Sequence, residues 1–598
     1  MTLDQLEDWQ RTNKCGDLTI EDEGKTVVLM GWVNSRRDHG GVIFVDLRDF
    51  AGLAQVVFGE QHSKDAFVKA DNLRSEYVIA VRGTVAKRVD NMINPKMDTG
   101  QIEIFVHELK VFNTCKNLPF RISDEQQDVT ERTRLKYRTL DLRRNKMQRN
   151  LILRSKAAQV TRNYFYDAGF YEIDTPFLTK STPEGARDFL VPSRVNPGQF
   201  FALPQSPQLF KQILMISGYD RYFQIVKCFR DEDLRGNRQP EFTQIDIELS
   251  FSDQNTVINV IEKLMIKLFK ETINYEISTP ISRMSYDDAM ENYGSDAPDL
   301  RFGLKLIDIS DIAKTCSFQV FNSAVEKGGI VKAIMVPGGA SFSRKELDDY
   351  TEFVKIYRST GMVWAKINED QSWQSPVAKF LGKEEITAIN ERTGANAGDL
   401  IVLVADSAKI VHDSLGNLRK EIAKKTGLLK ANDFQFTWVT GFPLFEYDEE
   451  EKRYNSSHHP FTMPDMSDLD TWETKDPTRI KSVAYDLVLN GVEIGGGSVR
   501  IHQKETQERI FRLLSLTEEE TKAKFGFFLD SLEMGTPPHA GIAMGFDRIM
   551  MFLTDTDSIR DVIPFPKTQQ ASCLLTEAPS NIDTEQLKDL GISLRRSK

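Results

Sequence analysis

Hydrophobic and polar residues alternate in five short segments between residues 25 and 113, separated by Gly- and Asp-containing turns. A period of two over so few residues is typical of strands with one buried face. One helical pattern, residues 63–76, falls between the third and fourth segments. Five strands with a helix at that point is the order of an OB-fold barrel, although a generic small β-barrel remains the alternative. We therefore expect an N-terminal OB-fold, residues 1–115, of the kind that binds single-stranded nucleic acid.

The pattern changes twice after this barrel. Residues 157–301 alternate helices and strands, and strands with Gly-rich turns resume over 426–565. Between them, residues 302–425 form a separate α+β pattern without a catalytic signature, which indicates an insertion. The fold class expected is a multidomain α/β and β protein. Its remaining parts are a basic hinge, residues 116–156, and a C-terminal extension, residues 566–598.

Composition and charge narrow the function class. The chain has 598 residues, of which 40% are apolar and 28% charged, so it is globular. A net charge of −11 excludes a uniformly basic nucleic-acid binder. Residues 131–156 nevertheless hold ten basic side chains against two acidic ones, and both a phosphate-backbone contact and a solvated hinge helix remain open for this strip.

Location follows from what the sequence lacks. No apolar run is long enough to cross a membrane, and the acidic N-terminus has no secretory pattern. Five widely spaced cysteines form no C-x-x-C pair, so a disulfide framework is not expected. A cytoplasmic protein without membrane contact is the expectation.

Several common chemistries are excluded by spacing. Gly24-Lys25-Thr26 has the end of a phosphate-binding loop, but Thr19 stands where its first glycine is required. Gly495 and Gly497 lack the third glycine of a dinucleotide fingerprint. There is no H-E-x-x-H pair for zinc in the sequence.

Three segments carry candidate chemistry. Residues 163–176 predict a helix and a short strand that ends at Pro176; residues 222–251 predict a long-looped hairpin that presents Arg230. Residues 491–502 and 535–551 combine Gly-rich strands with Arg548 at a helix start. Guanidinium groups can hold phosphate oxygens bidentately, and a helix start favours anions. Each segment alone is more often structural.

Together, the order of these segments resembles motifs 1, 2 and 3 of class II aminoacyl-tRNA synthetases. With an N-terminal OB-fold, the chain resembles the Asp/Asn/Lys subgroup, and its local strings resemble the bacterial aspartyl-tRNA synthetases. The resemblance implies that the catalytic part is a class II synthetase antiparallel sheet flanked by helices, and that family also carries an α+β insertion between motifs 2 and 3. The strings are STPEGARDF (181–189), PQSPQLFKQ (204–212), FRDEDLR (229–235), HHPFT (458–462), EIGGGSVRIH (493–502) and GFDR (545–548).

The resemblance implies a homodimeric ligase that uses ATP and Mg²⁺ to activate L-aspartate as aspartyl-adenylate and transfers it to tRNA(Asp). Arg230 would hold the α-phosphate and Arg548 the γ-phosphate, while Phe242 would stack on the adenine. Asp486 and Glu493 would coordinate Mg²⁺. The other ATP contacts that the resemblance implies are Asp231, Glu232, Gln239, Gly545, Phe546 and Asp547.

For the amino acid, the family pattern assigns Arg500 and Lys211 to the side-chain carboxylate. Cations that need an anion would reject neutral asparagine. One of His458 and His459 would approach the same carboxylate, and which of them does so is open. The remaining implied aspartate contacts are Glu184, in a loop that closes over the substrate, with Ser206, Gln208, Arg230 and Asp246.

In the barrel, Phe44 would stack on an anticodon base, with Gln55 and Glu103 reading base edges. Arg36, Arg37 and Arg48 would hold phosphates. His39 accompanies relaxed tRNA choice in related enzymes, so charging of tRNA(Asn) as well as tRNA(Asp) is open. The rival functions are an asparaginyl- or lysyl-type synthetase and a non-catalytic RNA binder; the presence of both Arg230 and Arg548 argues against the second.

Overall fold

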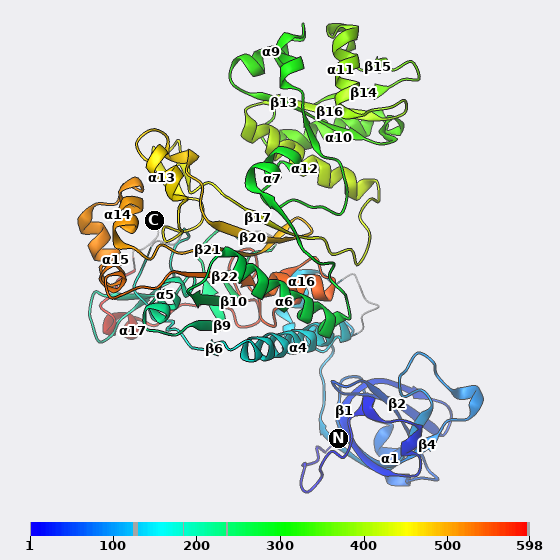
Figure 1. Ribbon diagram of the computed structural model, residues 1–598. Coiled ribbons are helices and arrows are strands. Elements are labelled where there is room, and N and C mark those ends of the chain that lie inside the picture. The colour runs from blue at the N-terminus through cyan, green and yellow to red at the C-terminus, as the bar shows by residue number, and fades with distance from the viewer. Residues whose placement is uncertain (1, 123–128, 183–184, 235–236, 595–598) are drawn as a thin grey trace. The chain divides into compact units, whose positions relative to one another are not determined.

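The computed structural model describes residues 2–122, 129–182, 185–234 and 237–594. It divides into two compact units, and Figure 1 labels many of their elements. The first consists of Met1–Ile152 with Ile563–Ser580, and the second of Leu153–Val562 with Asn581–Lys598.

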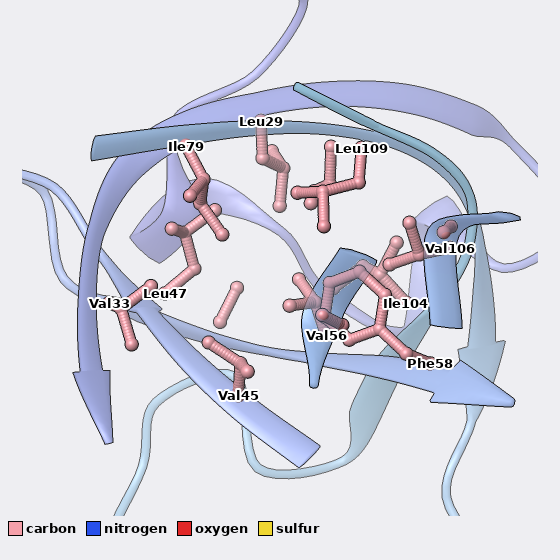
Figure 2. Close-up of a cluster of buried hydrophobic side chains, with 14 of the residues drawn as sticks. Leu29, Val33, Val45, Leu47, Val56, Phe58, Ile79, Ile104, Val106 and Leu109 are labelled. Carbon is pink, nitrogen blue, oxygen red and sulfur yellow. The ribbon is translucent and has the colours of Figure 1, made fainter. Parts of the chain in front are cut away.

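The first unit contains a closed five-stranded barrel in the order β1-β2-β3-β5-β4. This confirms the predicted barrel, with a helix between its third and fourth strands. Alternate apolar side chains point inward and form the hydrophobic core of the barrel (Figure 2). The elements are β1 Thr26–Asp38, β2 Val42–Arg48, β3 Leu53–Gly59, α1 Lys64–Ala70, β4 Val78–Lys87 and β5 Ile102–Asn113.

A buried ion pair fastens the barrel to the chain that follows it. The two Glu76 oxygens each lie 2.8 Å from Nη2 of Arg48, and Arg143 donates to the same carboxylate at 2.8 Å. Both members of the Arg48–Glu76 pair are buried. The implied phosphate contact of Arg48 is therefore not supported, because its guanidinium is already neutralised inside the protein.

The basic strip is largely occupied by internal carboxylates. The buried carboxylate of Asp141 lies 2.9 Å from Arg134, 2.5 Å from Arg138 and 3.8 Å from Arg144. Arg138 also donates to the carbonyls of Ile563 and Pro564. This arrangement favours the structural hinge over the phosphate contact for these arginines. The helices here are α2 Glu131–Lys136, α3 Arg138–Asp141 and the long α4 Asn145–Asp167.

The second unit is built on an eight-stranded sheet in the order β11-β17-β20-β21-β22-β10-β9-β6. Its pairs are antiparallel except for β11 with β17 and β6 with β9 at the two edges. This confirms the predicted class II sheet. The strands are β6 Tyr171–Glu172, β9 Arg221–Phe229, β10 Glu241–Ser250, β11 Ser282–Ser285, β17 Phe436–Thr440, β20 Ala484–Leu489, β21 Val492–Val499 and β22 His539–Gly545.

Strand β10 shows how the sequence orients this sheet. Its residues alternate between Gln244, Asp246, Glu248 and Ser250 on one face and Ile245, Ile247 and Leu249 on the other, and all are buried. Phe223, the β9 partner of Ile247, stacks on a phenylalanine of α4, so helices cover the apolar face. The polar face carries the side chains of the candidate site described below. The neighbouring helices are α5 Gln208–Ile216, α6 Gln254–Ile273 and α16 Phe546–Thr554.

The insertion has its own sheet, in the order β12-β13-β16-β14-β15, with hydrophobic clusters on both sides. Arg419 is wholly buried and donates to the carbonyls of Asp299, Gly303 and Leu304. The elements are β12 Leu306–Asp308, α8 Ser310–Thr315, α9 Gln319–Glu326, β13 Ile330–Val336, α10 Arg344–Lys355, β14 Val363–Ile367, β15 Trp373–Gln374, α11 Lys383–Thr393, β16 Leu400–Asp406 and α12 Ala408–Lys425.

Shorter elements complete the fold, and among the described residues no helix combines the length and apolarity needed to cross a membrane. They are β7 Leu190–Pro192, β8 Phe200–Ala202, α7 Tyr286–Tyr293, β18 Phe445–Asp448, β19 Arg453–Ser456, α13 Met466–Trp472, α14 Lys504–Leu513, α15 Glu518–Leu532 and α17 Thr584–Asp589.

The Glu76→Gln variant should destabilise the barrel by about 3–5 kcal/mol, because it removes the counter-charge of a buried guanidinium. The control is Asp90→Asn, which breaks an exposed pair with Lys87 at 3.5 Å and should cause no measurable change. Urea unfolding, followed by hydrogen exchange of β1 and β2 peptides, measures both. Equal stability of the two variants would show that the Arg48–Glu76 pair contributes nothing.

Candidate active site

A cavity of about 440 Å³ opens on the polar face of the large sheet. Its walls come from strands β10, β20, β21 and β22 and from helices α5 and α16. It thus gathers residues from the second and third candidate segments, whereas none of its lining residues comes from 163–176. The sequence-predicted residues that line it are Ser206, Gln208, Lys211, Arg230, Glu232, Gln239, Phe242, Asp246, His458, His459, Asp486, Glu493, Arg500, Gly545, Asp547 and Arg548.

Four buried charges form the floor of one end. Lys211 of α5 lies 2.6 Å from Asp246 and 3.3 Å from Glu248, both on β10. Arg500, just after β21, donates through Nε and Nη2 to the two oxygens of Glu248, at 2.9 and 3.1 Å. No side chain of the four is more than 2% exposed. We call Lys211, Asp246, Glu248 and Arg500 the charge quartet; its two cations and two carboxylates balance.

The burial of the quartet restricts how closely strand β22 can approach Glu248, and it changes the pKa values of both carboxylates. A Cβ on Gly541 would overlap the Glu248 carboxylate, so only glycine lets β22 run beside it. Burial raises the pKa of Asp246 to about 6, although the Lys211 ammonium opposes the shift. Burial acts on Glu248 too, but the charges of Arg500 and Lys211 hold its pKa below the usual range. Glu248 is therefore the firmly ionised member, bound to Arg500.

The adjacent histidines take different places. Nε2 of His459 lies 2.7 Å from Nη1 of Arg500, and because a guanidinium only donates, this imidazole accepts and is neutral. Burial, then the Arg500 charge, holds the pKa of His459 well below its ordinary value. His458 instead points Nε2 at Asp486, 3.4 Å away. His459 thus supports the quartet, and His458 faces the carboxylates at the other end.

Two carboxylates converge at that other end. A Cβ on Gly496 would lie 2.9 Å from Oδ1 of Asp486 and 3.4 Å from Oε1 of Glu493, so both oxygens overhang this glycine. Burial and the Asp486 charge raise the pKa of Glu493. Within the described ranges no group of three or more His, Cys, Asp or Glu could hold a metal. Mg²⁺ needs only one or two carboxylates when phosphates supply further oxygens, so the pair fits it.

Cationic and aromatic side chains lie between the two ends. The Arg230 guanidinium sits 5.2 Å from the centre of the Phe242 ring, across the β9–β10 hairpin. Arg548, in the first turn of α16, donates 2.7 Å to the carbonyl of Glu493. A nucleoside triphosphate and its cation need positive groups for the phosphates, an aromatic face for the base and carboxylates for the metal. The two guanidiniums, the Phe242 ring and the Asp486–Glu493 pair match these needs.

Comparison with known families decides the class. Residues 130–569 match the model for "tRNA synthetases class II (D, K and N)", and residues 27–112 match "OB-fold nucleic acid binding domain". The chain belongs to the class II tRNA synthetases. Relatives of similar length carry the name "Aspartate--tRNA(Asp/Asn) ligase": the protein of Syntrophotalea carbinolica is 55% identical over 99% of both chains, and that of Geotalea uraniireducens is 56% identical over the same share.

Solved structures agree on the fold. Asparaginyl-tRNA synthetase from Pyrococcus horikoshii, complexed with asparaginyl-adenylate, superposes with a TM-score of 0.59 at 18% identity, over 94% of this chain and 98% of that one. A putative aspartyl-tRNA synthetase from Leishmania major gives 0.57 at 19% identity, over 95% and 96%. At such identity the likeness establishes the shared fold alone.

Some predicted residues of this synthetase lie outside the cavity. Phe546 is buried under the guanidinium of Arg154, which lies 4.7 Å from its ring centre, so an ATP contact by this ring is not supported. Among the described residues, Asp231 does not line the cavity, and its backbone N–H donates to the carbonyl of Arg187. Glu184 falls outside the described residues. In the barrel unit, Gln55 donates to Glu103 at 3.1 Å, and His39 meets Phe44 edge-on at 5.6 Å.

The sequence analysis missed Glu248, although it completes the quartet. A usable signal existed, because Glu248 continues the every-second-residue polar series of β10 after Asp246. A carboxylate on a strand that is apolar at each alternate position needs a buried partner. The quartet also corrects the picture of cations awaiting an anion: Lys211 and Arg500 already have carboxylate partners.

The raised pKa of Asp246 should make the thermal stability of the protein depend on pH. Its pKa of about 6 in the fold exceeds that of the unfolded chain, so its contribution to stability is complete below the unfolded value and is lost as pH rises through about 6. Asparagine does not titrate. The Tm of Asp246→Asn, relative to the unaltered protein, should therefore rise between pH 4.5 and pH 7, as measured by differential scanning calorimetry.

The matched control is Asp253→Asn at the start of α6. Hydrogen bonds from Thr256 hold the pKa of Asp253 below its usual value, so its contribution is lost only under more acidic conditions. Its Tm difference should stay flat over the same range. A flat difference for Asp246→Asn as well would rule out the raised pKa.

Proposed function

We propose that this class II synthetase is an aspartate–tRNA ligase that charges both tRNA(Asp) and tRNA(Asn). The observation that carries the proposal is the charge quartet at the amino-acid end of the cavity. The relatives at 55% and 56% identity bear the name of that activity, and their likeness extends over almost the whole chain. The charge quartet and the names of these relatives both argue against an asparaginyl- or lysyl-type enzyme.

Charge balance accounts for the choice of aspartate. Oδ2 of Asp246 is buried without a hydrogen-bond partner among the described residues, which suits the α-ammonium of a substrate. That ammonium competes with Lys211 for Asp246 and leaves one positive charge uncompensated. The side-chain carboxylate of aspartate restores balance beside Lys211 and Arg500. Asparagine cannot, and a buried unpaired charge of this kind supports discrimination of about 10⁴-fold.

The nucleotide occupies the other end in this proposal. Arg230 binds the α-phosphate, Phe242 stacks on the adenine, and Arg548 binds the γ-phosphate. Glu232 and Gln239, which also line the cavity, contact the base and the reacting phosphate region. Asp486 and Glu493 would hold Mg²⁺, which supplies charge neutralisation for the phosphates.

No side-chain nucleophile is required. The substrate α-carboxylate attacks the α-phosphorus and pyrophosphate leaves. A hydroxyl of the terminal adenosine of tRNA then attacks the aminoacyl carbonyl, and AMP leaves. The chain's own residues contribute by fixing the two reactants and by stabilising charge at the α-phosphate through Arg230. Ser206 and Gln208, adjacent on the cavity wall, orient the amino acid.

The barrel would bind the anticodon in the proposed enzyme. Phe44, Gln55 and Glu103 lie on one face of three neighbouring strands, because Phe44 pairs with Val57, Val57 pairs with Phe105, and residues two apart on a strand share a face. Arg37 pairs with Phe44 across β1 and β2. Arg37 lies 2.9 Å from Asp46 and Arg36 lies 2.7 Å from Asp71, so tRNA phosphates would compete with these carboxylates for the two guanidiniums. Stacking on an aromatic ring and edge hydrogen bonds suit unstacked anticodon bases.

Assembly and location complete the proposal. Strand β6 is the edge strand of the large sheet, and Tyr166, Tyr171, Phe177 and Leu178 around it are exposed. Exposed apolar side chains beside an open edge favour a subunit contact, which we propose is a homodimer. The expected site of action is the cytoplasm, where tRNA is charged.

Amino-acid-dependent pyrophosphate exchange, run with each of the twenty amino acids, tests the substrate. Aspartate alone should support exchange, and Arg500→Leu should reduce it by at least about 10³-fold because the carboxylate loses its guanidinium. Retained tRNA binding would show that the variant is folded. Exchange with asparagine only, or unaltered turnover in Arg500→Leu, would refute the proposal.

Charging of purified tRNA(Asp) and tRNA(Asn) tests the second part. Both should accept aspartate from this enzyme at comparable rates. Codons for the two amino acids differ only in the first base, so one anticodon base separates the tRNAs. His39→Leu, which alters the edge contact with Phe44, should lower charging of tRNA(Asn) roughly tenfold more than that of tRNA(Asp). Loss confined to tRNA(Asp) would contradict this role.

A further inference from the structure

Arg154 of helix α4 lies where three separate parts of the second unit meet. Its Nη1 is 2.6 Å from Oδ1 of Asp547 and 3.3 Å from the carbonyl of Val562. Its Nη2 donates 3.1 Å to Oγ1 of Thr243 on β10. Its guanidinium also covers the ring of Phe546. One side chain therefore contacts the hairpin strand, the start of α16 and the segment that follows α16.

The contacted residues are neighbours of the nucleotide-binding groups. Thr243 follows Phe242, and Asp547 precedes Arg548. The two are themselves joined, because the backbone N–H of Thr243 donates 2.7 Å to Oδ2 of Asp547. Asp547 is only 2% exposed, so its charge depends on Arg154 for neutralisation. Oδ2 thus joins α16 to β10 through a hydrogen bond, whereas Oδ1 faces Arg154 as an ion pair without hydrogen-bond geometry.

We infer that Arg154 is a positioning residue for ATP. It fixes β10 against the first turn of α16, and so sets the distance between the Phe242 ring and the Arg548 guanidinium. The inference rests on the proposed function only in taking these two groups as the adenine and γ-phosphate contacts. Arg154 itself is absent from the cavity wall among the described residues, so it acts through the others.

The geometry requires arginine rather than any cation. A guanidinium offers several donors in one plane, so it reaches Asp547, Thr243 and Val562 at once while stacking on Phe546. An ammonium keeps the charge opposite Asp547 but cannot span the same three acceptors. Arg154→Lys should thus retain part of the function, and Arg154→Met should retain less. A displacement of about 1 Å at a positioned group can cost roughly 10²-fold in rate.

Two measurements separate positioning from general damage. In pyrophosphate exchange, Arg154→Met should lower kcat/KM for ATP roughly 10²-fold while the KM for aspartate changes less than about threefold. Arg154→Lys should fall between this variant and the unaltered enzyme. Calorimetric titration with ATP alone should show the same order of affinities, and it needs no amino acid. ATP binding without aspartate activation would count against the proposed function and leave this inference testable.

The matched control is Arg162→Met, two turns further along the same helix. Arg162 also binds a carboxylate, with Nε 3.0 Å from both oxygens of Glu172, but it contacts none of the nucleotide groups. It should leave ATP affinity unchanged, and light scattering should show the same assembly state for all variants. The inference is overturned if Arg162→Met weakens ATP equally, or if Arg154→Met weakens aspartate and ATP to the same extent.

Discussion

Burial of four charges around strand β10 is the constraint on which the rest of the site depends. Lys211, Asp246, Glu248 and Arg500 are removed from water, and that is tolerable only because each has an opposite charge within 3.3 Å. Their balance leaves no room for a substrate that adds charge of one sign alone. In the proposed function aspartate meets this condition, because its α-carboxylate faces the nucleotide and the quartet receives only the α-ammonium and the side-chain carboxylate, whose charges cancel.

The sheet supplies the positions that this balance needs. Alternation along β10 directs Asp246 and Glu248 to one face, while helices cover the isoleucines on the other. Glycine at 541 lets the adjacent strand approach Glu248, and glycine at 496 leaves space beneath Asp486 and Glu493. At both ends of the cavity, therefore, a glycine on one strand leaves room for a carboxylate on the strand beside it.

Much of this arrangement was predictable from the sequence, and the limits have physical causes. Period-two alternation located the barrel strands, and the motif arginines converge on one cavity as expected. Partners distant in the chain were not predictable: Arg48 is taken by Glu76, and Arg134 and Arg138 surround Asp141. A run of basic residues carries no information on which of them meet internal carboxylates. The different surroundings of His458 and His459 likewise depend on tertiary contacts alone.

The hydrogen bonds of Arg419 to the start of the insertion determine where this module can be exchanged between related proteins. Its guanidinium binds carbonyls of Asp299, Gly303 and Leu304, which precede the first insertion strand, from a helix that comes more than a hundred residues later. The inserted sheet and the segment that leads into it consequently depend on each other and should be transferred together. A chimera that swaps the module between relatives should therefore be cut upstream of residue 299, because a junction at β12 would take the backbone that positions these carbonyls from a different protein than the arginine.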